Sequence, residues 1–127
     1  MVRLLDVEKK ALIVDDQESI RETLVGVLAD EGWSSVTASS GQGALDIVKN
    51  QDFNLVLLDI WMDGIDGIET LQRLKDLKPE LPVVIMSGHG TIETAVKSTK
   101  LGAYDYLEKP LSLDKLLPIL QLSLIHI

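Results

Sequence analysis

The chain contains no cysteine, which excludes a disulfide framework, a zinc knuckle and a thiol nucleophile. Basic residues are scarce as well, because 12 Lys and Arg stand against 20 Asp and Glu, for a formal net charge of −8. This balance argues against direct binding of nucleic acid, whose phosphates are bound by clusters of Lys and Arg. No uncharged apolar run reaches the roughly 18 residues of a membrane span, and the N-terminal sequence MVRLLDVEKK lacks the apolar core of a signal peptide. We therefore expect no membrane segment and no direct contact with nucleic acid.

The chain does have a regular alternation of short apolar runs and amphipathic segments. Its 127 residues, of which 46% are hydrophobic, are enough for one core. The alternation predicts an α/β domain in which helices cover both faces of a parallel sheet. The predicted strands are residues 11–14, 35–38, 55–58, 83–86 and 104–107. The first, third and fourth runs are almost wholly apolar, which indicates burial on both faces, whereas the more polar second run indicates an edge strand.

Apolar residues at helical spacing predict five helices that follow these strands. The first helix is predicted from Ile20, Leu24, Val27 and Leu28, and a short second helix covers residues 44–48. The third helix is predicted from Ile68, Leu71 and Leu74, and the fourth from Ile92, Ala95, Val96 and Thr99. Ser112 is the predicted N-cap of the fifth helix. Gly32, Pro79 and Gly102 are the predicted stop signals. Pro118 should kink the last helix or end it early, because proline in a helix interior costs about 3 kcal/mol. We expect a single domain over residues 1–127, with a structured core at about 9–122 and a tail at 123–127 of linker or foreign origin.

Three acidic residues stand where two of the apolar runs end. Asp15 and Asp16 follow residues 11–14, and Asp59 follows residues 55–58. Because the carboxyl ends of parallel strands lie along one edge of a sheet, these carboxylates should converge. Crowded carboxylates repel one another, and oxygen ligands with room for water and a phosphate suit Mg²⁺. The cluster indicates phosphoryl transfer to Asp59, while the simpler alternative for any one of these residues is a solvated loop carboxylate or a helix cap.

Further groups follow the later strands in a set order. Residues 62–67 read M-x-x-x-D-G, Ser87 follows residues 83–86, and Lys109 and Pro110 come soon after residues 104–107. Together with the aspartates, these features resemble a response-regulator receiver domain of two-component signalling over almost the whole chain. Residues 88–110, GHGTIETAVKSTKLGAYDYLEKP, are most similar to receivers of sigma-54-dependent activators of the nitrogen-regulation class. The resemblance implies a flavodoxin-like, doubly wound sheet of five parallel strands in the order 2-1-3-4-5 with five helices.

The resemblance also implies a function and a site. Asp59 would accept a phosphoryl group from a sensor histidine kinase, with Mg²⁺ as the cofactor. The implied metal-binding residues are Asp15, through a metal-bound water, and Asp16, Asp59 and the Trp61 backbone carbonyl. The implied phosphoryl-binding and switch residues are Ser87, Gly88, Lys109 and Tyr106, and the bond between Lys109 and Pro110 is expected to be cis. We expect a cytoplasmic signalling domain, not an enzyme acting on other molecules, that controls an ATPase and DNA-binding output domain and forms a phosphorylation-dependent homodimer.

Three side chains near the site have a second interpretation. Trp61 and His89, each two residues after a site residue, should flank the mouth of the site and slow the loss of phosphate, although packing or a solvent-facing orientation is the alternative. Tyr106 matches the family's switch aromatic, yet a strand tyrosine is commonly part of the core.

Asp63 stands where many receivers have proline, which changes the rigidity of the loop and the charge near the metal.

Two other functions use a similar sheet. A Mg²⁺-dependent phosphatase for small phosphate esters also forms an aspartyl phosphate, but it usually needs a second acidic residue where this chain has Trp61. It also needs a cap over its substrate pocket, for which 127 residues leave no room. A flavin-binding module needs a phosphate-binding loop after the first strand, where Asp15 and Asp16 would repel phosphate.

Overall fold

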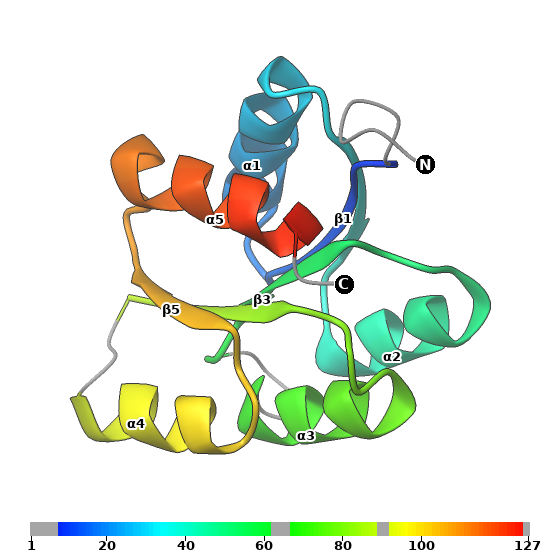
Figure 1. Cartoon of the computed structure of the whole chain (residues 1–127), viewed down its shortest axis with the longest axis vertical. Helices are drawn as coiled ribbons and strands as arrows, with labels where there is room; N and C mark the ends of the chain where they lie inside the picture. Colours follow the sequence, from blue (N-terminus) through cyan, green and yellow to red (C-terminus); the bar gives the residue numbers. More distant parts are fainter. Residues whose placement is uncertain (1–7, 62–66, 89–91, 126–127) are drawn as a thin grey trace.

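Five parallel strands form one sheet in the order β2-β1-β3-β4-β5, as the resemblance predicted (Figure 1). The computed structural model describes residues 8–61, 67–88 and 92–125. The strands are β1 (Lys10–Val14), β2 (Ser34–Ala38), β3 (Leu55–Asp59), β4 (Val83–Ser87) and β5 (Asp105–Glu108). The helices are α1 (Glu18–Asp30), α2 (Gly41–Asn50), α3 (Gly67–Leu77), α4 (Ile92–Lys100) and α5 (Leu113–Ile125). Each predicted strand is present, with ends that differ by one residue at most.

The helices cover both faces of the sheet. In Figure 1, α1 and α5 lie on one side of the strands, and α2, α3 and α4 lie on the other. Successive side chains of a strand point to opposite faces, so β1 contributes Leu12 to the core beneath α2 and α3 and Ile13 to the core beneath α1 and α5. The three inner strands are almost fully buried, while β2 and β5 are partly exposed at the edges. The prediction of an edge strand at residues 35–38 is therefore confirmed.

Local signals explain where most helices begin and end. Gly32 and Gly102 have positive φ angles of 83° and 102° just after α1 and α4, a conformation that glycine adopts without a Cβ clash. Helix α2 is longer than the predicted residues 44–48, because the Ser40 hydroxyl accepts a hydrogen bond from the Gly43 N–H at 3.0 Å and caps the helix earlier. No helix within residues 8–61, 67–88 and 92–125 is both long and apolar enough to cross a membrane.

The predicted buried face of α4 is wrong. Val96 is 47% exposed and Thr99 is exposed, whereas Ser98 is fully buried. The Ser98 hydroxyl donates to the carbonyl of Thr94 at 2.9 Å, which removes most of the cost of burying a polar group. The helix thus places a small polar side chain inward, which an apolar pattern cannot predict.

Pro118 was predicted to kink the last helix or to end it early, and the early end is not observed. Helix α5 continues past Pro118 to Ile125, beyond residue 122, where we expected the structured core to end. Four side chains of α5 on either side of the proline are at most 5% exposed: Leu116, Ile119, Leu120 and Leu124. Burying each of them stabilises the fold by roughly 1.5–3 kcal/mol, and the sum exceeds the cost of one interior proline, about 3 kcal/mol.

Candidate functional site

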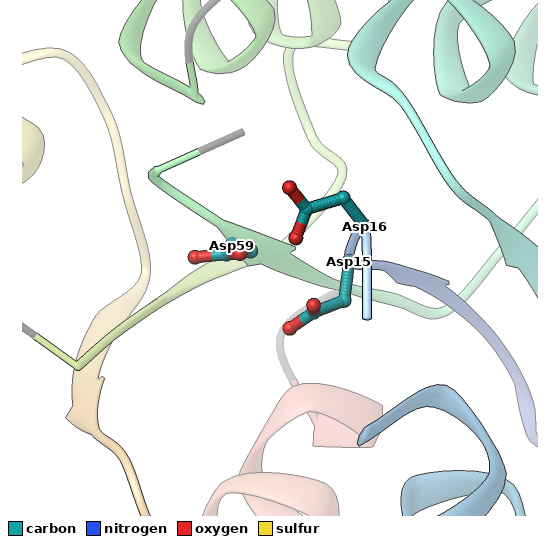
Figure 2. Close-up of side chains that lie close together, drawn as sticks. All are labelled: Asp15, Asp16 and Asp59. Atoms are coloured by element: carbon teal, nitrogen blue, oxygen red, sulfur yellow. The ribbon is translucent and has the colours of Figure 1, made fainter. Parts of the chain in front are cut away.

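Parallel pairing places the acidic residues side by side. Val14 pairs with Leu58 across β1 and β3, so Asp15 and Asp59 each follow a paired position at the same edge of the sheet. Carboxylate oxygens of Asp15, Asp16 and Asp59 lie within 4.8 Å of one another. Figure 2 shows the three side chains directed toward one small volume. Asp15 and Asp59 are buried and Asp16 is exposed, so the cluster opens to solvent on one side.

The buried Asp15 is held by its backbone as well as by its side chain. Its N–H donates to the Ala38 carbonyl at 3.1 Å, and its Oδ1 accepts the Gln17 N–H at 2.9 Å. The Arg21 guanidinium donates to the Asp15 carbonyl at 2.7 Å. Sequence reasoning missed Gln17 and Arg21. The available signal was a basic residue near the N-terminus of a helix, where the helix dipole disfavours a cation.

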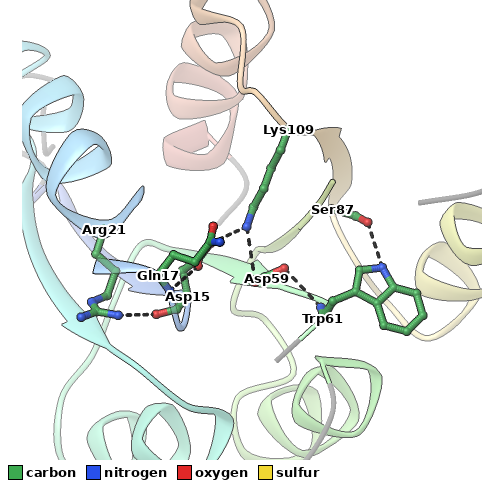
Figure 3. A network of polar contacts seen from close by, with 7 residues as sticks. All are labelled: Asp15, Gln17, Arg21, Asp59, Trp61, Ser87 and Lys109. Atoms are coloured by element: carbon green, nitrogen blue, oxygen red, sulfur yellow. Dashed lines mark hydrogen bonds and ion pairs between the residues drawn. The ribbon is translucent and has the colours of Figure 1, made fainter. Parts of the chain in front are cut away.

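Lys109 brings a positive charge to the buried carboxylates from the far edge of the sheet. Its Nζ lies 2.6 Å from Asp15 Oδ2 and 3.3 Å from Asp59 Oδ2 (Figure 3). The Lys109 N–H donates to the Ser87 carbonyl at 2.8 Å, which fixes the start of the side chain beside β4. The peptide bond between Lys109 and Pro110 is cis.

The pKa of the Asp59 carboxyl is raised above its ordinary value of 3.8. The main cause is burial, which disfavours the charged form. The Trp61 N–H, which donates to Asp59 Oδ1 at 3.2 Å, and the Lys109 ammonium lower the pKa, while the charge of Asp15 raises it. A bound cation would offset both the burial and the repulsion, so the environment of Asp59 suits a carboxylate that works beside a metal ion.

Ser87 lies at the end of β4 and is fully buried. Its Oγ accepts a hydrogen bond from the Trp61 indole Nε1–H at 3.1 Å (Figure 3), and the Trp61 residue is 55% exposed. Next along the chain, Gly88 is exposed, and among the described residues other than its chain neighbours the atom nearest to a Cβ placed there is the Lys109 Cβ, at 4.0 Å. The structure thus brings Ser87, Trp61 and Lys109 around Asp59, and no other described residue outside the chain neighbours of Gly88 would crowd a side chain at that position.

Tyr106 lies on β5, half-buried against the core cluster that includes Leu71 and Ile85. Its hydroxyl oxygen is buried and has no hydrogen-bond partner among the described residues. Two residues discussed above, His89 and Asp63, lie outside the described residues, as does most of the M-x-x-x-D-G stretch.

A family comparison agrees with this geometry. The family model described as "Response regulator receiver domain" matches residues 11–121. The chain belongs to this family. It is therefore the receiver domain of a two-component response regulator, with the flavodoxin-like fold that the sequence predicted.

Relatives of this receiver domain are transcriptional regulators. The chain is 48% identical over 115 residues to "Nitrogen assimilation regulatory protein NtrX" of Azorhizobium caulinodans, covering 89% of this chain and 25% of the relative. It is 44% identical to "Transcriptional regulatory protein ZraR" of Escherichia coli K12, covering 91% of this chain and 26% of the relative. The crystal structure of the NtrX receiver domain from Brucella abortus superposes with a TM-score of 0.85 at 44% identity, covering 91% of this chain and 98% of that one.

The receiver domain spans about a quarter of the length of these curated relatives. Similarity to NtrX and ZraR confirms the predicted resemblance to receivers of the nitrogen-regulation class. The phosphatase alternative is not favoured, because the position that would carry a second acidic residue holds Trp61, whose indole is hydrogen-bonded to Ser87.

Proposed function

We propose that the domain is a phosphorylation switch in which Asp59 accepts a phosphoryl group from a sensor histidine kinase. The observation that carries this proposal is the convergence of three carboxylates, from the ends of two strands, with the Lys109 ammonium between Asp15 and Asp59. A purely structural role would not explain why two carboxylates are buried beside each other, because such burial is costly.

The donor set fits Mg²⁺, since it offers closely spaced carboxylate oxygens and no sulfur or imidazole ligand among the described residues. We assign Asp16, Asp59 and the Trp61 carbonyl as direct ligands and Asp15 as the residue that holds a coordinated water. Bound there, the cation would offset the negative charge of the carboxylates and of the incoming phosphoryl group.

The chain's own groups then perform the transfer. A carboxylate oxygen of Asp59 attacks phosphorus, forming an O–P bond as the P–N bond of a phosphohistidine breaks. The Lys109 ammonium pairs with a carboxylate before the transfer and with a phosphoryl oxygen after it. The Ser87 hydroxyl donates to another phosphoryl oxygen, and Gly88, which has no side chain, leaves room for the group on the side of the described residues. By this proposal the domain catalyses only its own phosphorylation and dephosphorylation.

The output of the switch is proposed to be another part of a longer chain. When Ser87 moves toward the phosphoryl group, Tyr106 turns further inward and the surface of α4, β5 and α5 changes. The buried Tyr106 hydroxyl without a partner among the described residues supports this step, because a second orientation that gives it a partner would be favoured. The proposed target is an ATPase and DNA-binding output domain that controls transcription.

The decisive experiment is incubation with acetyl phosphate and Mg²⁺ followed by intact-mass measurement. We expect one added phosphoryl group on the wild type, none after removal of Mg²⁺ with EDTA, and none on Asp59→Asn. A matched control is Asp76→Asn, an exposed carboxylate on α3. A phosphoryl mass that persists in Asp59→Asn would overturn the assignment.

A further inference from the structure

Trp61 donates hydrogen bonds to Asp59 and Ser87, the two residues between which a phosphoryl group would lie in the proposed mechanism. Its backbone N–H donates to Asp59 Oδ1 at 3.2 Å, and its indole Nε1–H donates to Ser87 Oγ at 3.1 Å. The Trp61 residue is 55% exposed, so water is available to it as an alternative partner. The indole N–H nevertheless points inward to a hydroxyl that is fully buried (Figure 3).

This hydrogen bond constrains what the Ser87 hydroxyl can do. An indole N–H is a donor only, so the bond occupies a lone pair of Ser87 Oγ and turns that oxygen toward residue 61. A phosphoryl group on Asp59 would present charged oxygens to the same hydroxyl, and bonds to charged acceptors are roughly twice as strong as neutral ones. In the proposed switch the Ser87 side chain moves toward the phosphoryl group, and a displacement of Oγ in that direction would lengthen its 3.1 Å contact with the indole nitrogen of Trp61.

We infer that Trp61 is a positioning residue that holds Ser87 in its resting orientation, and that phosphoryl binding exchanges the Trp61–Ser87 hydrogen bond for a bond from Ser87 to the phosphoryl group. The inference rests on the proposed phosphorylation of Asp59. The indole hydrogen bond would then stabilise only the state without a phosphoryl group, so a variant that lacks the indole N–H should favour the phosphoryl-bound state.

The first test is the indole N–H resonance of Trp61 in a ¹H–¹⁵N spectrum. The chain has two tryptophans, and Trp33, which is 5% exposed in the core, serves as the internal reference. We expect the Trp61 resonance to move on Ser87→Ala and again on addition of Mg²⁺ and beryllofluoride to the wild type, while Trp33 stays in place. A Trp61 resonance that is unaffected by Ser87→Ala would overturn the hydrogen bond itself.

The second test is the affinity for beryllofluoride in the presence of Mg²⁺, measured by calorimetry. Trp61→Phe keeps an aromatic ring at this position but removes the N–H, and we expect it to bind about threefold to fivefold more tightly than the wild type, the value of one net hydrogen bond. Trp61→Ala, which also removes the ring, should bind at least as tightly. Unchanged or weaker binding by Trp61→Phe would overturn the inference.

The outcomes separate this inference from the proposed function. If the wild type neither binds beryllofluoride nor gains mass from acetyl phosphate, the proposed function fails and the exchange of bonds fails with it. If the wild type binds beryllofluoride while the Trp61 resonance stays in place, only the inference about Trp61 fails.

Discussion

The Lys109 ammonium lies closer to Asp15 than to Asp59, at 2.6 Å from Asp15 Oδ2 and 3.3 Å from Asp59 Oδ2. The side chain of Asp15 is fully buried and that of Lys109 is 16% exposed, so the pair has little access to water. In this state Lys109 pairs with both carboxylates and makes the shorter contact with Asp15. In the proposed mechanism, the ammonium gives up part of its pairing with these carboxylates when it binds a phosphoryl oxygen on Asp59.

The first prediction is that Lys109→Ala lowers the free energy of unfolding by about 3 kcal/mol, because it leaves a buried carboxylate without its cation. Mg²⁺ should restore part of the loss by supplying a positive charge to the same oxygens. Urea unfolding with and without Mg²⁺ measures both effects, with Lys115→Ala, an exposed lysine on α5, as the control. Equal losses in the two variants would show that the pair does not stabilise the fold.

The second prediction concerns stabilisation by the metal itself. Mg²⁺ at ten times its dissociation constant should raise the free energy of unfolding by about 1.4 kcal/mol. Asp16→Ala should abolish most of this gain without destabilising the metal-free protein, since Asp16 is exposed and is repelled by its neighbours. Thermal unfolding across a Mg²⁺ titration provides the measurement. If Asp76→Ala, which changes an exposed carboxylate on α3, reduces the gain equally, a specific site is disproved.

The third prediction is a pH dependence that originates at Lys75. Burial lowers the pKa of Lys75 below 10.5, and its Nζ donates to the Leu81 carbonyl at 3.0 Å. The folded chain thus holds this proton less tightly than the unfolded chain, so stability should rise as the pH increases through the lowered pKa toward 10.5. Over this pH range, the free energy of unfolding of the wild type should rise relative to that of Lys75→Met by less than about 1 kcal/mol, because the Lys75 side chain is only partly buried.

Unfolding in urea at a series of pH values measures this difference. Lys97→Met, which changes an exposed side chain of α4, is the matched control. A difference between wild type and Lys75→Met that stays flat from neutral pH to 10.5 would contradict the prediction.

The fourth prediction is a dimer that depends on phosphorylation. Lys97 and Lys100 are exposed on α4, and Asp105 and Glu108 are exposed on β5. Two copies can pair these charges reciprocally about a two-fold axis, with the 47%-exposed Val96 available for apolar contact. We expect light scattering to show a dimer mass with Mg²⁺ and beryllofluoride and a monomer mass without them.

Charge reversal provides a sharp control for this dimer. A chain with Lys97→Glu and Lys100→Glu and a second chain with Asp105→Lys and Glu108→Lys should each remain monomeric but pair when mixed. Each exposed ion pair contributes only about 0–1 kcal/mol, so both lysines are changed in one chain and both acidic residues in the other. A mixture that stays monomeric while the wild type dimerises would place the interface elsewhere.

The fifth prediction is that the phosphorylated domain loses its phosphate slowly. The exposed indole of Trp61 lies beside Ser87, where it hinders the approach of water to an acyl phosphate on Asp59. Trp61→Asn should accelerate the decay about tenfold, equivalent to about 1.4 kcal/mol of barrier, and His89→Ala should change it in the same direction by less. Decay of protein loaded with acetyl phosphate is the measurement, and a rate unaltered by both substitutions would rule out shielding.

The sequence pattern was sufficient to predict those contacts of the site that follow from the order of the strands alone. Once two apolar runs are recognised as neighbouring parallel strands, Asp15 and Asp59 must meet at their carboxyl ends, and no knowledge of loops is needed. The bond from Trp61 to Ser87 depends instead on how one exposed loop residue turns, which no periodicity encodes. The preference of Lys109 for Asp15 is a difference of 0.7 Å between two contacts (3.3 minus 2.6) and depends on side-chain packing.

Gly67 allows α3 to begin directly against the end of β3. The Gly67 N–H donates to the Ile60 carbonyl at 3.0 Å, and a Cβ at residue 67 would lie 2.3 Å from Ile60 Cα, a distance at which the backbone must separate. The chain therefore leaves β3 and enters α3 at nearly the same point in space. A side chain at position 67 would force these two backbone segments apart and displace the end of β3 that carries Asp59.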